Sequence, residues 1–175
     1  MPTSYQSPMR QDHEPQHSKS QGPESNLAVG TVRVSDLLQR KGNDVHTIRP
    51  QDTLAFAVER LSELRIGALV VTHSTGALAG ILSERDVVRK IAEVQSAEAL
   101  ELTAFDVMTK TVETADEDAP LISLLRRMTE GRFRHMPVLD EDDTLVGMIT
   151  IGDVVHHRLL ELEHEALQLK QLIVG

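Results

Sequence analysis

The stretch Gly147-Met148-Ile149-Thr150-Ile151-Gly152-Asp153 predicts the end of a buried strand that turns directly into a helix. That helix would carry a hydroxyl and a carboxylate close to its start. The same register occurs 67 residues earlier, in Gly80-Ile81-Leu82-Ser83-Glu84-Arg85-Asp86, where a glycine, two apolar residues, a hydroxyl and an aspartate again follow in order. The chain is therefore predicted to contain a tandem repeat.

The match between the two copies extends beyond these motifs, without a gap, from residues 45–88 to residues 112–155. Identical residues are scattered through the predicted strands and helices of both copies: Thr47 with Thr114, Leu54 with Leu121, Arg60 with Arg127, Glu63 with Glu130, Arg65 with Arg132, Val71 with Val138 and Leu78 with Leu145. A chance pair of short motifs does not explain such scatter. We interpret both halves as one supersecondary unit that is used twice.

The composition narrows the classes of function. A chain of 175 residues can form one ordinary domain or two small ones that share a core, and the repeat favours the second. Its lack of cysteine excludes disulfides, thiolate nucleophiles and Cys-ligated zinc. No apolar run approaches the roughly 18 to 20 residues of a membrane span, and the N-terminus lacks the apolar core of a secretory signal, so we expect a soluble cytoplasmic protein without a membrane partner. The net charge of -9 argues against a nucleic-acid polymer as partner.

Four arginines nevertheless crowd into nine residues of this acidic chain: Arg126, Arg127, Arg132 and Arg134. Such a local cluster suits a small anion better than a polymer. The alternative is a solvated helix end whose cations face the negative end of the helix dipole. Before the repeat is considered, both interpretations stay open.

Residues 1–30 are rich in Ser, Gln, Pro and His and hold almost no clustered aliphatic residues, so they cannot bury enough surface to offset the entropy lost on ordering. We predict a disordered tail there, a first repeat over residues 31–95 and a second over residues 96–175. His13 and His17 have the spacing of helical metal ligands, but a proline between them disfavours that helix. We therefore expect a solvated tail.

Each repeat is predicted to have the order strand, helix, strand, strand, helix. The predicted strands are short and apolar: 45–48, 68–71, 78–82, 112–114, 136–139 and 145–149. The predicted helices have apolar residues at helical spacing: one from Leu54 that Gly67 stops, one after Ser83, one from Pro120 to about Glu130 and one from Gly152. Asp52 is expected to cap the first of these helices. A further turn of helix is expected before each repeat, at 36–38 and 106–108.

The predicted fold class is α+β, with two β-α-β-β-α repeats packed as a pseudo-symmetric pair and a long C-terminal helix. A three-stranded sheet is too small to stand alone, so we expect the two sheets to bury their exposed faces against each other. Residues 93–103, between the copies, are polar and rich in alanine, which indicates a helix extension or a linker.

Both motifs also have the pattern of a helix capping box. Ser83 with Asp86, and Thr150 with Asp153, are each a hydroxyl residue followed three positions later by an acid. Such caps are common and stabilise a helix by roughly 1 kcal/mol. Two features favour a function in addition: the pair recurs behind a glycine-led strand, and the acid is Asp both times although Glu reaches back more easily.

These residues resemble a known family, the tandem cystathionine-β-synthase (CBS) domain pair, also called a Bateman module, as found in stand-alone bacterial signalling proteins. The resemblance covers about residues 31–160. The glycine, two apolar residues, Ser or Thr, two variable residues and Asp of that family are present in both copies, and the element order agrees.

The resemblance implies that an adenosine nucleotide binds in the clefts between the two repeats. In such a site Asp86 and Asp153 would accept hydrogen bonds from the ribose hydroxyls, and Ser83 and Thr150 would contact phosphate or ribose. A helix start suits this role, because its free N–H groups and positive dipole end attract an anion.

The resemblance also implies a role for residues around the second strand of each repeat. Arg65 and Arg132 stand where the family often supplies a cation for phosphate, and the arginine fork suits phosphate oxygens. All residues expected to contact ligand are Thr47, Arg65, Gly67, Ala68, Ser83, Arg85, Asp86, Thr114, Arg132, Arg134, His135, Met136, Pro137, Thr150 and Asp153.

The two clefts are not expected to be equal. Residues 134–138 look like the family's second-repeat pattern, where adenine lies against apolar and backbone atoms, whereas residues 67–71 have no cation or proline. For Met136 the alternative of a core residue is favoured, since a methionine in a strand usually packs. His135 is expected to contact either the ligand or a dimer partner.

The last helix carries an apolar seam with spacings of four and three: Val155, Leu159, Leu162, Ala166, Leu169 and Ile173. The seam predicts packing on its own repeat or pairing with a second chain, and the length of the helix favours a homodimer. His157, Glu161 and His164 share this helix, but the histidines are seven residues apart. We expect a solvated face there and no metal site.

The predicted function is a non-enzymatic sensor module that binds an adenine nucleotide, AMP before others, and passes its signal to a separate effector chain. The alternatives are an NAD-type dinucleotide, whose adenosine half would use the same groups, and a ligand-independent dimerisation scaffold. An enzyme is not expected, because the sequence lacks a Gly-Lys-Ser/Thr phosphate loop, a nucleophile elbow and a histidine-acid set with metal spacing. The nucleotide is expected as a ligand and not as a catalytic cofactor.

Overall fold

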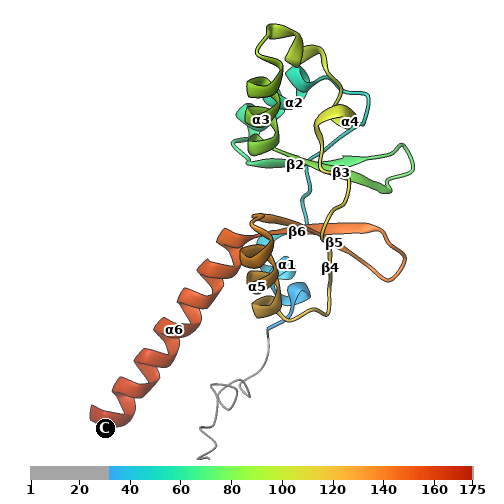
Figure 1. The fold of residues 1–175 in the computed structure, drawn as a ribbon. Coiled ribbons are helices and arrows are strands. Elements are labelled where there is room, and N and C mark those ends of the chain that lie inside the picture. Colours follow the sequence, from blue (N-terminus) through green and yellow to red (C-terminus); the bar gives the residue numbers. More distant parts are fainter. Residues whose placement is uncertain (1–31, 175) are drawn as a thin grey trace, which may run out of the picture. The chain divides into compact units, whose positions relative to one another are not determined.

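The computed structural model describes residues 32–174. The predicted tail over residues 1–30, with His13 and His17, lies outside the described residues. Within them the predicted α+β class is confirmed, because two three-stranded sheets are accompanied by helices and a long helix ends the second repeat (Figure 1).

The first repeat carries one sheet and two helices. Its elements are β1 (Thr47–Ile48), α2 (Leu54–Leu64), β2 (Ala68–Thr72), β3 (Leu78–Ser83) and α3 (Glu84–Val94). Strand β1 runs parallel to β2, and β2 pairs antiparallel with β3 in the predicted hairpin. The sheet order is β1-β2-β3, and all residues of the central strand β2 are buried.

The second repeat has the same architecture. Its elements are β4 (Ala115–Asp116), α5 (Leu121–Gly131), β5 (His135–Leu139), β6 (Leu145–Thr150) and α6 (Ile151–Val174). The sheet order is β4-β5-β6, again with one parallel and one antiparallel pairing. The register also repeats, because Ile48 pairs with Val71 as Ala115 pairs with Val138. The predicted tandem repeat is therefore confirmed.

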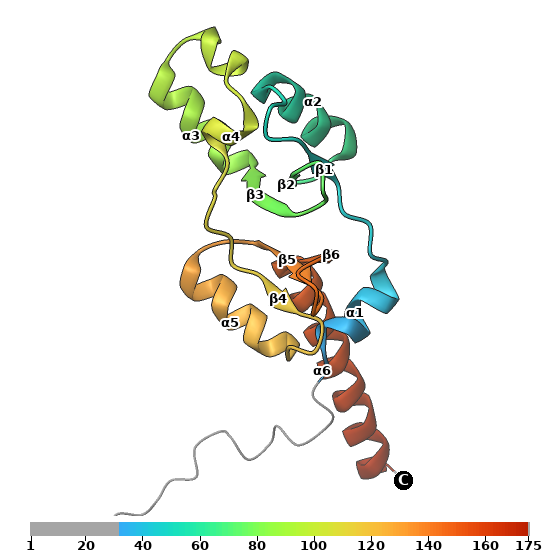
Figure 2. The same cartoon turned by 90° about the vertical axis from the view of Figure 1, so that its right-hand side faces the viewer.

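Both faces of each sheet are covered. In Figures 1 and 2 the two sheets lie between the helices of the first repeat and those of the second. Leu69 and Val71 of β2 belong to the core that the helices of the first repeat complete. Val70 points to the opposite face, because side chains alternate along a strand, and it is fully buried as well.

The helices that precede the two repeats are exchanged between them. These connecting elements are α1 (Val34–Lys41), the 3-10 helix η2 (Ala97–Glu101) and α4 (Ala104–Val107). Helix α1 precedes the first repeat but packs in the core of the second through Val34, Leu37 and Leu38. Helix α4 precedes the second repeat but packs in the core of the first through Ala104 and Val107. The sequence interpretation did not foresee this exchange.

The exchange explains the glycine that begins each motif. A Cβ added at Gly147 would lie 2.7 Å from Cδ2 of Leu38 in α1. A Cβ added at Gly80 would lie 2.6 Å from Sδ of Met108 and 2.8 Å from the carbonyl oxygen of Thr109, just beyond α4. Glycine is required at both places because the exchanged segment lies directly against the strand.

The start of α2 differs from the prediction. The N-cap is Thr53, whose side chain accepts the N–H of Phe56 at 3.2 Å. Asp52, the predicted cap, instead accepts the N–H of Arg49 at 2.7 Å. The aspartate therefore holds the turn before the helix, and the prediction of Asp52 as the cap is wrong.

The end of α2 also differs. The helix ends at Leu64, because Arg65 takes a left-handed conformation with φ of 54°, and Gly67 lies beyond this point. Arg132 ends α5 in the same way with φ of 56°. The left-handed conformation costs a non-glycine residue about 1–2 kcal/mol. Because it recurs at two matched arginines, the fold must constrain the position of these residues.

Strand β4 lies further along the chain than the predicted strand 112–114, because one hydrogen bond is missing. In the first repeat the N–H of Val70 donates to the carbonyl of His46 at 3.1 Å. The residue equivalent to Val70 is Pro137, which has no N–H. The parallel pairing therefore starts one residue later in the second sheet, at Ala115.

Most of α6 is exposed. Its first turns are anchored, because Val154 and His157 are buried. The following large apolar residues are exposed: Val155, Leu159, Leu160, Leu162, Leu167, Leu169, Leu172 and Ile173. The alternative in which this seam packs on its own repeat is therefore wrong.

Candidate functional site

A cleft of about 370 Å³ opens between the start of β2 in the first repeat and the end of β6 in the second. We call it the Thr150 cleft. Its walls are formed by Lys41, Asp44, His46, Arg65, Ile66, Gly67, Ala68, His135, Met148 and Thr150. Both repeats contribute, so the cleft depends on the assembled pair. The structure thus brings together five of the residues expected to contact ligand: Arg65, Gly67, Ala68, His135 and Thr150.

Thr150 and Asp153 form a capping box at the start of α6. Oδ2 of Asp153 accepts the N–H of Thr150 at 2.8 Å and its hydroxyl at 2.9 Å. The N–H of Asp153 in turn donates to Oγ1 of Thr150 at 3.1 Å. The capping interpretation is therefore confirmed. It leaves room for a second role, because the Asp153 side chain remains 25% exposed.

The side chain of Lys41 reaches this carboxylate from α1. Its ammonium donates to Oδ2 of Asp153 and to the carbonyl of Met148, each at 2.7 Å. Partial burial acts to raise the pKa of Asp153, but the hydrogen bonds from Lys41 and Thr150 outweigh it and hold that pKa below its usual value. The carboxylate is therefore ionised near neutral pH and accepts hydrogen bonds.

His135 begins β5 and lies against the other repeat. A Cβ added at Gly67 would lie 3.2 Å from Cε1 of this ring. Burial lowers the pKa of His135, although the nearby Glu84 acts in the opposite direction. The imidazole is therefore neutral near pH 7 and offers the cleft one donor and one acceptor nitrogen.

Arg65 supplies positive charge to the same cleft. Its left-handed backbone places it between α2 and β2, on the cleft wall. Among residues 32–174 its guanidinium has no ion-pair partner, in contrast to Arg60 on α2, which pairs with Glu63. A fork of unengaged N–H donors beside Lys41 suits a phosphate or another small anion.

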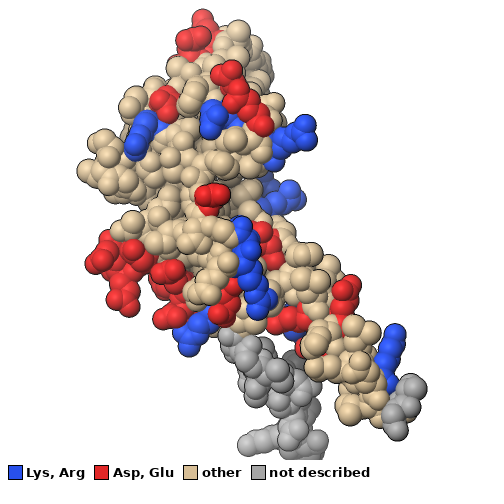
Figure 3. All heavy atoms as spheres, turned by 180° about the vertical axis from the view of Figure 1, so that it is seen from behind, with Lys and Arg blue, Asp and Glu red and all other residues tan. Residues whose placement is uncertain are grey.

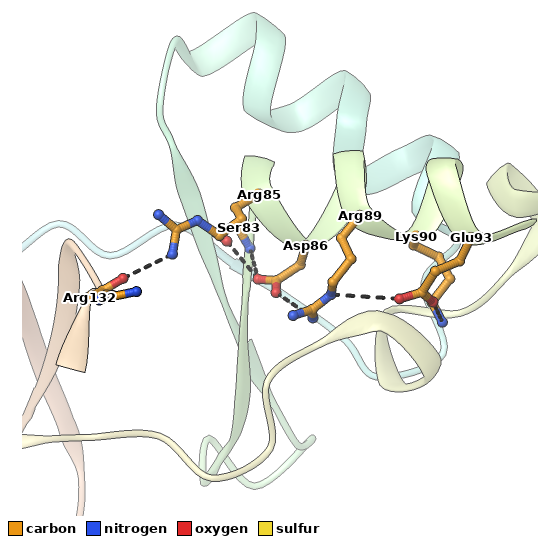
Figure 4. A network of polar contacts seen from close by, with 7 residues as sticks. All are labelled: Ser83, Arg85, Asp86, Arg89, Lys90, Glu93 and Arg132. Atoms are coloured by element: carbon orange, nitrogen blue, oxygen red, sulfur yellow. Dashed lines mark hydrogen bonds and ion pairs between the residues drawn. The ribbon is translucent and has the colours of Figure 1, made fainter.

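A second site with the same motif lies at the start of α3. Oδ2 of Asp86 accepts the N–H of Ser83 at 3.0 Å and its hydroxyl at 2.6 Å. Oδ1 accepts from Arg89 at 2.9 Å. Arg85 donates to the carbonyl of Arg132 at 3.0 Å and so joins the first repeat to the second (Figure 4). The motif of the first repeat therefore meets the matched arginine of the second.

The cluster of four arginines is divided by the fold. Arg126 pairs with Glu130 on α5 at 2.8 Å. Arg127 binds Glu113 and the carbonyl of Thr114. These two arginines bind groups of the second repeat, so the interpretation as an anion site narrows to Arg132 and Arg134, which lie just before β5.

Several residues expected to contact ligand are placed elsewhere. Met136 is fully buried in the core of the second repeat, so its alternative role as a core residue is confirmed and its side chain does not reach a cleft. Pro137 is buried next to it in β5. Thr47 is exposed in β1, and Thr114 is half-buried just before β4. None of the four lines the Thr150 cleft, which leaves their expected role without support there.

Five residues of the cleft were not predicted: Lys41, Asp44, His46, Ile66 and Met148. The first three lie between the end of α1 and the start of β1, and the match between the repeats begins only at Val45. The residue equivalent to Lys41 is Met108, so the repeat carried no signal there. Only the exchange of α1 brings Lys41 to the second motif.

Other kinds of site find no support in the described part of the chain. No group of three or more His, Cys, Asp or Glu side chains within residues 32–174 is arranged to hold a metal ion. No helix in that range is long and apolar enough to cross a membrane. On the face that Figure 3 draws, basic side chains stand among acidic ones and form no continuous basic surface.

The family model for the CBS domain matches this chain twice, over residues 34–93 and 104–159. A similar protein is the CBS domain-containing protein CBSX3, mitochondrial, of Arabidopsis thaliana. It is 33% identical over 153 residues, which cover 83% of this chain and 73% of that protein. Each match contains one of the two hydroxyl-acid motifs.

Solved structures agree with this assignment. The CBS-domain containing protein ATU1752 from Agrobacterium tumefaciens is 42% identical, with a TM-score of 0.68 over 72% of this chain and 98% of that one. CBSX2, solved in complex with AMP, is 27% identical, with a TM-score of 0.62 over 73% of this chain and 96% of that one. The tandem sheets, the paired motifs and these matches together show that the chain belongs to the CBS domain family, with two CBS domains in tandem.

Proposed function

We propose that this protein is a non-enzymatic regulatory module that binds an adenine nucleotide, with AMP as the first candidate, between its two CBS domains. The Thr150 cleft carries the proposal, because both domains line it and its Thr150 pairs with Asp153 at the start of α6. The complex of the similar CBSX2 with AMP supports the class of ligand.

The groups around the Thr150 cleft suit the parts of a nucleotide. The ionised Asp153 would accept hydrogen bonds from the ribose hydroxyls, and Thr150 would contact ribose or phosphate at the start of α6. Arg65, without an acidic partner in the described chain, would bind phosphate. Gly67 and Ala68, which line the cleft, would lie beside the adenine.

The Ser83–Asp86 motif would form a second, unequal site. Its carboxylate is more buried, with the side chain 8% exposed, and is already bound by Arg89. Arg132 and Arg134 from the second CBS domain would supply cations for phosphate there. We propose that both sites use the same chemistry with different affinities.

A ligand that touches both domains can act as a signal. If the two domains can adopt two arrangements, the ligand shifts the equilibrium toward the arrangement that it binds more tightly. The shift in free energy cannot exceed the difference between the two binding free energies. The described residues contain no catalytic domain, so we propose that a separate effector chain receives the change. We further propose a homodimer in which α6 of each protomer covers the exposed apolar seam of the other.

Isothermal titration with AMP, ATP, NAD and S-adenosylmethionine tests the proposal against its two alternatives. Tighter binding of AMP than of NAD supports a mononucleotide sensor. Tighter binding of NAD would favour the dinucleotide alternative, whose adenosine half uses the same groups. No binding of any of them to the folded protein would leave the dimerisation scaffold.

The expected cytoplasmic location stays a prediction from the sequence. The relative CBSX3 carries the word mitochondrial in its name. Fractionation of cells that express the full chain with a C-terminal tag would locate the protein directly.

A further inference from the structure

The ammonium group of Lys41 occupies a place in the Thr150 cleft that the proposed function assigns to the ligand. It lies 2.7 Å from Oδ2 of Asp153 and 2.7 Å from the carbonyl of Met148, which lines the same cleft. Its side chain is 28% exposed, so the contact is partly shielded from solvent. Lys41 itself is part of the cleft wall.

The contact saturates the carboxylate oxygen that it meets. Oδ2 of Asp153 accepts two hydrogen bonds from Thr150 in addition to the one from Lys41. Oδ2 thus already has three donors, more than its about two lone-pair positions, so a ribose hydroxyl can reach Oδ2 only in place of Lys41, the one donor that is not part of the cap. A ribose hydroxyl that binds Oδ2 therefore competes with the Lys41 contact.

We propose that Lys41 is an intramolecular competitor that lowers the affinity of the Thr150 cleft for the ribose of a nucleotide and so makes the two sites unequal. This inference rests on the proposed function. It adds Lys41 of α1, the helix before the first repeat, as a residue that sets the affinity of the cleft beside the motif of the second repeat.

The first motif has no competitor that comes from another element. The residue that matches Lys41 is Met108, which carries no charge and lies against Gly80. Asp86 binds Arg89 through Oδ1. Its Oδ2 accepts only the two hydrogen bonds from Ser83 that form the helix cap. The Arg89 side chain is 59% exposed, so it can swing into solvent without disturbing another element.

Lys41 is tied to the helix that would transmit the signal. The preceding residue, Arg40, lies with Nη1 3.3 Å from Nε2 of the buried His157, also on α6. The last turn of α1 thus holds α6 at two points. A ligand that displaces Lys41 removes one of these points and leaves the other.

The experiment replaces Lys41 with the residue found at the matching place. Lys41→Met keeps an unbranched side chain, shorter by one atom, and removes its charge. Adenosine is the probe, because it carries the ribose without a phosphate that a lysine would attract. Backbone amide signals of Thr150 and Ser83, followed by NMR during the titration, report the two sites separately.

We expect Lys41→Met to bind adenosine about tenfold more tightly at the Thr150 signal, because the competing contact no longer has to break. The Ser83 signal should titrate as in the wild type. Arg40→Met is the matched control, since it removes a neighbouring cation of α1 that contacts α6 but not Asp153. It should leave both affinities unchanged.

Three results would overturn the inference. Equal or weaker binding of adenosine by Lys41→Met would show that Lys41 does not compete. An equal gain in Arg40→Met would show that loosening of α1, and not release of Asp153, raises affinity. A titration without ligand must also show that the pKa of the Asp153 carboxyl rises in Lys41→Met, and an unchanged pKa would mean that the contact is absent in solution.

The same experiment separates this inference from the proposed function. If neither the wild type nor Lys41→Met binds adenosine or AMP, the proposed function fails and the inference falls with it. If both proteins bind with one affinity, only the inference fails.

Discussion

The two CBS domains are alike in their motifs but differ in the cation that each motif aspartate meets. Asp86 binds Arg89, three residues further along its own helix, and its side chain is 8% exposed. Asp153 binds Lys41, which lies 112 residues away in sequence, and is 25% exposed. The same local motif therefore meets a cation of its own helix in the first CBS domain and a cation from outside its repeat in the second.

The helices that follow the two motifs differ as well. Helix α3 has 11 residues and ends at Val94, whereas α6 has 24 and continues to Val174. The additional residues of α6 carry an exposed apolar seam, and α3 has no such extension. We therefore expect the second CBS domain to be the one that carries the contacts to other chains.

The largest expected effect tests the close approach behind each motif. Gly80→Val should destabilise the protein by about 3 kcal/mol, because its Cβ would meet the backbone oxygen of Thr109 as well as Met108. Gly147→Val should cost less, since the first atoms that it meets belong to the side chain of Leu38. Urea unfolding monitored by circular dichroism measures both. A smaller loss for Gly80→Val than for Gly147→Val would contradict the explanation.

The second prediction removes the difference between the two helices. A chain that ends after Glu161 leaves α6 as long as α3 and deletes most of the seam. Its dimer should dissociate about a hundredfold more readily, equivalent to about 2.7 kcal/mol, because the buried apolar area is lost. Sedimentation over a range of micromolar concentrations measures the change.

A pair of point variants controls for the truncation. Leu169→Glu puts a charge on the seam and should weaken the dimer, whereas Gln171→Glu puts the same charge off the seam and should not. A monomeric full-length protein would contradict the homodimer outright. An unweakened dimer after truncation would contradict the part assigned to the seam.

The third prediction separates binding from capping at the second motif. Asp153→Ala should weaken AMP binding by about 2 kcal/mol, because a hydrogen bond to a charged group is lost. The loss of the cap should also lower stability without ligand by about 1 kcal/mol. Isothermal titration and thermal unfolding measure the two effects.

Asp106 provides the matched control for this variant. It caps α4 in the same way, accepting the N–H and the hydroxyl of Thr103 at 3.0 and 2.6 Å, but it lies outside the two repeated hydroxyl-acid motifs. Asp106→Ala should lower stability and leave AMP affinity unchanged. If Asp153→Ala behaved in the same way, the motif would be a cap only.

The smallest expected effect concerns pH. Burial lowers the pKa of His135 in the folded protein, so the unfolded chain takes up this proton first as the pH falls. The stability of the folded state should therefore decrease as the pH falls below about 6.5, the ordinary value for histidine. His135→Gln should reduce that decrease between pH 7.5 and 5.5, measured by urea unfolding. An identical pH dependence in both proteins would contradict the contribution of His135.

Much of the fold could be predicted from the sequence, because it depends on local patterns. Apolar runs of four or five residues located β2, β3, β5 and β6 to within one or two residues. The hydroxyl-acid spacing located both helix starts, since a capping box needs only residues three apart. Errors arose where a single residue decides a boundary: Thr53 in place of Asp52 as the cap, and Pro137 delaying β4.

The candidate site was predictable only in part. Arg65, His135 and Thr150 could be proposed from motif and repeat, and the structure brings them into one cleft. The sequence could not decide whether Met136 faces the cleft or the core. Neighbouring side chains of a strand point to opposite faces, and only the tertiary structure shows which face meets the core.

The sequence by itself determined that this chain has two copies of one unit, each with a capped helix behind a glycine-led strand, because those features arise between residues close together in the chain. The exchange of α1 and α4 between the repeats, and with it the contact of Lys41 with Asp153, was decided only by the tertiary structure. These contacts join segments more than a hundred residues apart, or segments on opposite sides of a repeat. They form because the buried apolar faces of Leu38 and Val107 fit the other repeat, and no periodicity or spacing in the sequence records that fit.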